Sequence, residues 1–221
     1  MRFALLGPVY PYRGGIAHYT TQLDKMLRQQ GHETLLVSFR RQYPRWLFPG
    51  ASDRDPSRQP LAAENAHYWL DSLNPLTWLT SFARIRRFGP QVFVLQWWTT
   101  FWAPVWLTLA LLNAWLLRAQ LVFICHNVLP HDAQGWERWV ARLVLGRGAR
   151  FIAQSEEERG RLLALLPRAA VAVVPMPVFN MFSGEKAPKE EARRRLHLPP
   201  EATVLLFFGI VRPYKGLGDL I

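Results

Sequence analysis

The sequence predicts an α/β fold built on a doubly wound, mostly parallel sheet, and two observations support this. Short apolar runs of strand-like composition alternate along the chain with longer segments of helical periodicity. Half of the 221 residues are hydrophobic, which is enough to bury a core and excludes a disordered or fibrous chain. Because alternating strands and helices form βαβ units, we expect the strands to run parallel.

Each element is predicted from its local pattern. The expected strands are Phe3–Leu6, Thr34–Phe39, Val92–Gln96, Leu121–Cys125, Arg150–Ala153, Val171–Val174 and Val204–Phe208. The expected helices are Ile16–Gln30, Pro75–Arg87, Pro104–Leu117, Trp136–Leu145, Glu156–Leu166 and Glu190–Leu196. Gly31 is placed to end the first helix, and Ser155 with Glu158 obeys the spacing of a capping box. Arg40–Asn65 is expected to be a long surface excursion.

A change of composition at Pro175-Met176-Pro177 predicts a domain boundary. We expect one domain over residues 1–177, a linker with a short helix over 178–200, and the first strand and helix start of a second α/β domain over 201–221. A lone strand and one helical turn bury almost nothing, so the sequence is expected to be a fragment of a longer protein.

The segment Gly89–Leu117 has no charged residue and is long enough to span a bilayer. Basic residues flank the segment on both sides, Arg84, Arg86 and Arg87 before it and Arg118 after it. The flanking charges therefore do not indicate how a membrane-spanning helix would be oriented. Its prolines, polar residues and β-type start favour a buried strand, a tryptophan-rich loop and a mostly buried helix. A transmembrane helix remains the alternative reading.

Composition also restricts the class of partner. The net charge of +11 favours anionic partners such as phosphorylated molecules or an acidic membrane face. Nucleic acid is disfavoured, because the arginines are scattered and no helix-turn-helix or basic-aromatic sheet motif is present. Core packing is the default role for Trp97, Trp98, Trp102 and Trp106, with a membrane interface or stacking on an acceptor sugar as alternatives. One cysteine excludes a disulfide framework and a cysteine-cluster metal site, and fits a reducing, cytoplasmic compartment.

Four motifs, in order along the chain, resemble glycosyltransferases. Phe207–Gly216 (FFGIVRPYKG) closely resembles the opening of the donor domain of family-4 retaining glycosyltransferases of the GT-B fold. Pro11–Ala17 (PYRGGIA) between a strand and a helix, Phe123–His131 (FICHNVLPH) and Ala153–Glu156 (AQSE) resemble segments of the same family's N-terminal domain. The resemblance covers essentially all of the chain. It implies that residues 1–177 form the Rossmann-like acceptor domain and that residues 201–221 begin the donor-binding domain.

The resemblance implies a donor-phosphate site at Gly14, Gly15, Arg212 and Lys215. Bare glycine backbone at a helix start lets free amides approach an anion, although a glycine turn without a ligand is the simpler reading. Arginine and lysine suit a leaving diphosphate whose charge grows as the sugar departs, and the family needs no metal or other cofactor for this. Solvated loop charges are the alternative for Arg212 and Lys215.

His126 is the expected catalytic residue, since it matches the family's histidine facing the donor sugar and ends a buried strand. A hydrogen-bonded core histidine is the alternative. Arg13, Asn127 and Ser155 are expected as acceptor or sugar contacts, although helix capping is the preferred role of Ser155. His131 and Asp132 are interpreted as a loop pair.

The implied reaction moves a hexose from a nucleotide-diphosphate donor to an acceptor hydroxyl with retention at the anomeric carbon. The expected acceptor is a glycan or lipid-linked molecule, and the expected location is cytoplasmic, with peripheral attachment to the anionic inner leaflet of the cytoplasmic membrane. The main rival is a nonenzymatic module that binds anions or nucleotides. The sequence does not specify the sugar, the base or the acceptor.

Overall fold

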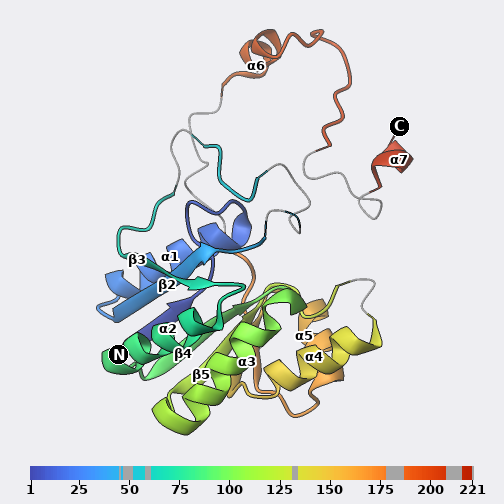
Figure 1. Cartoon of the computed structure of the whole chain (residues 1–221). Coiled ribbons are helices and arrows are strands. Elements are labelled where there is room, and N and C mark those ends of the chain that lie inside the picture. The colour runs from blue at the N-terminus through green and yellow to red at the C-terminus, as the bar shows by residue number, and fades with distance from the viewer. Residues whose placement is uncertain are drawn as a thin grey trace. The chain divides into compact units, whose positions relative to one another are not determined.

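The computed structural model describes residues 1–44, 46, 52–57, 61–130, 134–177, 187–207 and 216–220. The chain divides into two compact units, Met1–Val178 and Phe179–Ile221. The first unit contains the sheet and most of the helices (Figure 1). Among the described residues of the second unit, the regular elements are the helices α6 (Lys189–Arg195) and α7 (Leu217–Leu220).

The first unit is built on a parallel sheet whose strand order is β3-β2-β1-β4-β5-β6-β7. In chain order the strands are β1 (Arg2–Leu6), β2 (Glu33–Arg41), β3 (Ala66–Asp71), β4 (Val92–Trp97), β5 (Gln120–Cys125), β6 (Arg150–Ala153) and β7 (Val171–Val173). All pairings between strands of this sheet are parallel among the described residues. The order reverses between β1 and β4, which makes the sheet doubly wound, as predicted.

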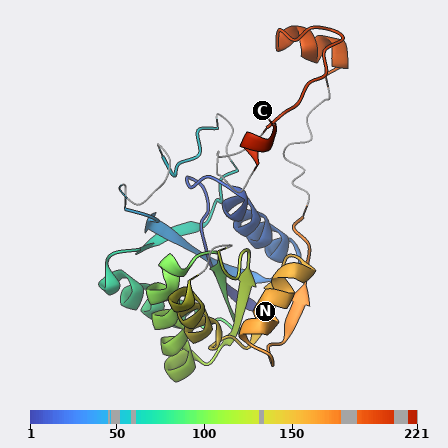
Figure 2. The same ribbon diagram turned by 90° about the vertical axis from the view of Figure 1, so that its right-hand side faces the viewer.

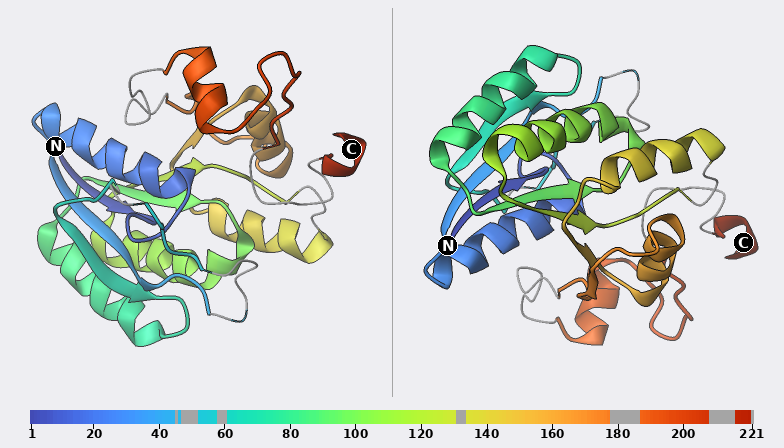
Figure 3. Two further views of the ribbon diagram at one scale, coloured as in Figure 1. Left: turned by 90° about the horizontal axis from the view of Figure 1, so that it is seen from above. Right: turned by 90° about the horizontal axis from the view of Figure 1, so that it is seen from below.

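Helices cover both faces of this sheet. The helix α1 (Gly15–Gln29) lies on one face, whereas α2 (Pro75–Phe88), α3 (Ala103–Leu112) and α4 (Gly135–Leu145) lie on the other (Figure 3). The helix α5 (Glu156–Leu165) connects β6 to β7. Because helices cover both faces, the central strand β4 has all six of its residues buried. Five of the six are apolar, and the exception is Gln96.

Local sequence signals set the ends of these helices. Asn74 caps α2 by accepting a hydrogen bond from the Leu76 amide at 3.1 Å, and Pro75 occupies the first helical position. Gly89 then ends α2 in the left-handed conformation, with φ of 62°. Gly31 follows α1 with φ of 79°, as predicted for a residue just past a helix end.

The tryptophans of the apolar segment belong to the core. Trp97, Trp102 and Trp106 are fully buried, and the Trp102 ring lies 4.2 Å from that of Phe39, centroid to centroid. Trp98 is half-buried, and its Nε1 donates a hydrogen bond to the Tyr43 hydroxyl at 2.8 Å. Core packing is therefore confirmed for the three buried rings, which are inaccessible to a membrane or a sugar.

One stretch of the described chain, Thr100–Leu117, is long and apolar enough to cross a membrane by length and hydropathy alone. It comprises a short 3₁₀ turn, η1 (Thr100–Trp102), then α3, then a π-helical turn, η2 (Asn113–Leu117). Trp102, Trp106 and Leu109 bury one side of this stretch completely. The stretch thus contributes to the core, as the sequence favoured, whereas Trp115 and Leu116 at its end are exposed.

Three sequence predictions were wrong. The strand β3 was missed, because an edge strand with a single buried residue, Leu70, has little hydrophobic pattern. Arg40 and Arg41 belong to β2 rather than to a surface excursion, and Arg41 pairs with Asp71 of β3 at 2.7 Å. Val204–Phe207 form no strand: no strand among the described residues pairs with this apolar run, and Val204, Leu205 and Leu206 are 46–83% exposed. Phe208 lies outside the described residues.

Candidate active site

The switch point of the sheet sets where a ligand can bind. In open parallel sheets, ligands bind beyond the carboxyl ends of the strands where the strand order reverses, here between β1 and β4. The predicted site residues of the first unit follow the ends of β1, β5 and β6: Arg13, Gly14, Gly15, His126, Asn127 and Ser155. All of them therefore lie along one edge of the sheet.

The loop that follows β1 is fastened by the segment around Asp53. The Arg13 amide donates to the Asp53 carbonyl at 2.9 Å, and the Asp55 amide donates to the Pro11 carbonyl at 2.9 Å. Tyr12 is buried; its hydroxyl donates to the Phe39 carbonyl at 2.9 Å, and burial raises its pKa to about 12. The loop is thus held on both sides before it reaches the glycine pair.

The glycine pair presents bare backbone at the start of α1. Gly14 has φ of 113°, where side chains are strained, and a Cβ on either Gly14 or Gly15 would meet no atom within 4 Å. The first turn of α1 has no acidic residue and no capping side chain. Among the described residues, the amides of Gly15 and Ile16 have no acceptor, so the positive end of α1 is open to an anion.

His126 is held rigidly just beyond β5. Its amide donates to the Trp97 carbonyl at 2.8 Å, and its Nε2 lies 2.5 Å from Gln96 Oε1. Tyr19 of α1 packs edge-on against the imidazole, with centroids 5.1 Å apart. Burial lowers the pKa of His126 to about 4, against a weaker opposing contribution from Gln154, so the ring is neutral at pH 7.

Three polar side chains form a row across the strand ends: Gln96 of β4, His126 after β5 and Gln154 after β6. We call these residues the strand-end row. Gln96 Nε2, His126 Nδ1 and Gln154 Nε2 are all buried without a hydrogen-bond partner. Unpaired buried polar atoms are costly and uncommon, and three on adjacent strands indicate a place where a polar ligand completes the hydrogen bonds.

The sequence analysis missed Gln96 and Gln154 as site residues. A signal for Gln96 was present, since it is the only polar residue in the apolar run Val92–Trp98 and stands where the strand ends. Gly7 makes room for it: a Cβ on Gly7 would lie only 2.5 Å from Gln96 Cγ. This close approach depends on pairing between β1 and β4, which the sequence does not display.

Ser155 has the structural role that the sequence favoured. Its Oγ accepts a hydrogen bond from the Glu158 amide at 3.2 Å and so caps α5. The reciprocal half of the capping box is wrong, because Glu158 Oε2 instead accepts from the Val128 amide at 2.6 Å. That contact ties α5 to the loop that carries His126. Arg13 is exposed and Asn127 is half-buried.

The remaining candidates are four predicted residues, a metal site and Cys125. Arg212, Lys215, His131 and Asp132 lie outside the described residues, so their predicted roles stay predictions. Within the described part of the chain, no three His, Cys, Asp or Glu side chains are grouped to hold a metal ion. Cys125 is buried, and burial raises its thiol pKa, so it is no nucleophile at neutral pH.

Comparison with known proteins agrees with this arrangement. Residues 14–177 match the family model of the glycosyl transferase 4-like domain. The chain belongs to this family. The match covers the glycine pair, the strand-end row and each helix described for the first unit, so the resemblance to glycosyltransferase family 4 is confirmed. No curated protein sequence matches the chain.

Solved structures of α-glucosyltransferases share the fold of this glycosyl transferase 4-like domain. One in complex with UDP and a DNA 13-mer containing an HMU base gives a TM-score of 0.52 at 11% identity, over 80% of this chain and 43% of that one. Another, in complex with UDP, gives a TM-score of 0.52 at 10% identity, over 80% of this chain and 44% of that one. The neighbours are GT-B glycosyltransferases, which confirms the fold class. The chain spans less than half their length.

Proposed function

We propose that the chain provides the acceptor-side domain of an enzyme that transfers a sugar from a nucleotide-diphosphate donor to an acceptor hydroxyl, with retention at the anomeric carbon. The observation that carries the proposal is the strand-end row, whose unpaired buried atoms lie at the carboxyl ends of β4–β6, on the same edge of the sheet as the open start of α1. A sugar offers several hydroxyls, each of which donates and accepts, and this matches a row of amide and imidazole groups.

Each site residue has a role in this proposal. The amides of Gly15 and Ile16 approach the donor diphosphate, and the neutral His126 hydrogen-bonds a hydroxyl of the donor sugar. A neutral imidazole serves better here than a cation, because it adds no positive charge beside an anomeric carbon that becomes positive in the transition state. Arg212 and Lys215, from residues 201–221, neutralise the departing diphosphate without a metal.

The acceptor is proposed to be a glycan or a lipid-linked molecule that meets the enzyme in the cytoplasm. The sugar and the base are left to experiment. DNA is present in the first of the two compared α-glucosyltransferase structures, where it belongs to that protein. A sugar-transfer assay that includes DNA among the acceptors therefore tests our expectation that nucleic acid is not a partner.

Donor binding by the 221-residue chain tests the proposal. Titration with UDP-glucose and other nucleotide sugars, up to about 10 mM, is followed by NMR of uniformly ¹⁵N-labelled chain. We expect saturable binding in the millimolar range, with shifts at the Gly14–Gly15 amides and at the His126 ring, and weaker binding by His126→Ala. A retained anomer in any transferred sugar supports the enzyme. If nucleotide sugar binds but no sugar is transferred, even by a longer version of the protein, the nonenzymatic module is favoured. If nucleotide sugar shifts neither the Gly14–Gly15 amides nor the His126 ring, the proposal is overturned.

A further inference from the structure

A second surface, on the helical layer opposite α1, is apolar and exposed. The outward side of α2 carries Leu76, Leu79 and Ala83 one turn after another, followed by Arg86 and Arg87. Leu79 is 49% exposed and Leu76 more so. The neighbouring helix α3 lies alongside α2 (Figure 2), and the two enclose a groove of about 470 Å³. We call this the α2–α3 groove.

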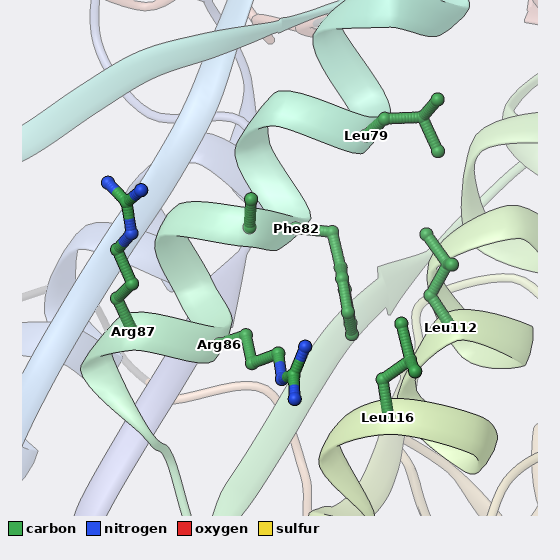
Figure 4. A pocket seen from close by; sticks show the side chains of 7 residues that line it. Leu79, Phe82, Arg86, Arg87, Leu112 and Leu116 are labelled. Carbon is green, nitrogen blue, oxygen red and sulfur yellow. The ribbon is translucent and has the colours of Figure 1, made fainter.

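The walls of the α2–α3 groove are apolar and its rim is cationic. Leu79 and Phe82 of α2 face Leu112 and Leu116 across the groove, and the Arg86 guanidinium lies at its end (Figure 4). Arg87 points from the same helical turn away from the leucines (Figure 4). A groove built this way accepts hydrocarbon between its walls and an anion at its rim.

The π-helical turn η2 adds a large exposed side chain to this surface. Asn113 is buried; its Nδ2 donates to the Ala119 carbonyl at 3.0 Å, and its Oδ1 accepts from the Ala119 amide at 3.2 Å. Arg118 closes the turn in the left-handed conformation, with φ of 58°. The anchored turn directs Trp115 outward, 69% exposed, next to Leu116. Single π-turns of this kind occur often at functional sites.

Charge along this part of the chain has one sign. From Ser72 to His131 the sequence contains no Asp or Glu, yet it contains Arg84, Arg86, Arg87 and Arg118. Arg84 is occupied in stacking on the Trp69 ring, 4.7 Å from its centroid. The other three flank the apolar side chains of α2 and η2.

We propose that the α2–α3 groove, with Trp115, docks the domain on the surface of an anionic lipid bilayer. Trp115 and the exposed leucines enter the interface, where indole rings are favoured, while Arg86 and Arg87 contact lipid phosphates. Thr100–Leu117 has a mean hydropathy of 1.4 but is only 39% buried within the fold, so much of an apolar segment faces outward. Its buried side is committed to the core, and the domain therefore lies on the membrane rather than crossing it.

This inference does not rest on the proposed sugar transfer. The surface belongs to α2 and η2, whereas the strand-end row lies at the carboxyl ends of β4–β6, and neither requires the other. An acidic protein or a second copy of the chain is the competing occupant. Protruding tryptophan and leucine side chains that border arginines, without any carboxylate, favour the bilayer.

Co-sedimentation of the 221-residue chain with vesicles tests this docking. Vesicles of phosphatidylcholine alone are compared with vesicles that contain phosphatidylglycerol. We expect binding to the anionic vesicles, at least about fivefold weaker for Arg86→Glu and roughly tenfold weaker for Trp115→Ala. Salt should weaken binding further, because it screens the attraction over about 8–10 Å. Lys25→Glu on α1, at the opposite face of the sheet, makes the same charge change and should bind like the wild type.

Each alternative gives a distinct result. Circular dichroism and thermal unfolding verify that every variant is folded before binding is measured. Equal loss for Lys25→Glu and Arg86→Glu, or no loss for Trp115→Ala, would show that the surface has been misassigned. Absence of binding to either vesicle overturns the proposal. So does a dimer in light scattering that Trp115→Ala converts to a monomer without altering sedimentation with vesicles.

Discussion

The Nε2 atom of His126 lies 2.5 Å from Oε1 of Gln96, and this contact joins the ends of two neighbouring strands. Since a neutral imidazole must donate through Nε2 to an amide oxygen, the contact leaves Nδ1 as a bare acceptor. Nδ1 is buried and unpaired. Gln96 therefore fixes which atom of His126 is available to a ligand, although it stands 30 residues earlier in the chain.

Replacing Gln96 by Leu tests this control of the ring. The substitution keeps a similar volume but removes the acceptor, so Nε2 loses its partner and both tautomers become populated. We expect about tenfold weaker binding of nucleotide sugar and a loss of about 1–3 kcal/mol in unfolding free energy. Imidazole ¹⁵N shifts report the tautomer. Unchanged shifts in a folded Gln96→Leu variant would show that Gln96 does not orient the ring.

The fold was predictable because its signals are local. The buried strand Val92–Gln96 is recognisable from its apolar run. The helix Pro75–Arg87 has an asparagine that can cap its start and a glycine that can end it. The edge strand β3 was not, because most of its side chains are accessible and pairing with β2 is what makes it a strand. Val204–Phe207 is the opposite case: its composition is apolar, yet it pairs with no strand among the described residues.

The candidate site was predictable only in part. His126 and the glycine pair stand out in the sequence because a family motif surrounds them. The partners Gln96 and Gln154 become visible only when the register brings three strand ends together. Glu158 satisfied the spacing of a capping box, yet its carboxylate reaches the Val128 amide, a long-range contact that spacing cannot express.

Stability should depend on pH through His126. Burial lowers its pKa from 6.5 to about 4, so between these values the unfolded chain binds more protons than the folded one. The contribution is fully present above pH 6.5 and is lost as the pH falls toward 4, by at most about 3 kcal/mol. Urea unfolding at pH 7 and pH 4.5 should show a smaller decrease for His126→Phe than for the wild type. His67→Gln removes an imidazole on the exposed edge strand and serves as the matched control.

Alanine at the two glycines of α1 should separate strain from ligand binding. Gly14→Ala forces a side chain into a conformation with φ of 113°, at a cost of about 1–3 kcal/mol. Gly15→Ala occupies open space at the first helical position and should change stability by less than about 0.5 kcal/mol. If donor phosphate approaches these amides, Gly15→Ala still weakens nucleotide-sugar binding. Wild-type affinity in Gly15→Ala would remove the glycine pair from the site.

Glu158 should matter to stability beyond its helix. Its carboxylate accepts from the Val128 amide at 2.6 Å and pairs with Arg161 at 2.8 Å. Glu158→Ala leaves a partly buried amide without an acceptor, so we expect a loss of about 1.5–3 kcal/mol in unfolding free energy.

Glu157→Ala is the control, since Glu157 also pairs with Arg161 but is 71% exposed, and it should cost less than about 0.5 kcal/mol. Hydrogen exchange distinguishes the cause: only Glu158→Ala should speed exchange at Val128, because that amide alone loses its acceptor. Equal effects of the two variants on stability and on exchange would mean that the Glu158 carboxylate acts through α5 alone. The loop that carries His126 would then be held by two other hydrogen bonds, from the His126 amide to the Trp97 carbonyl and from Trp97 Nε1 to the Val128 carbonyl.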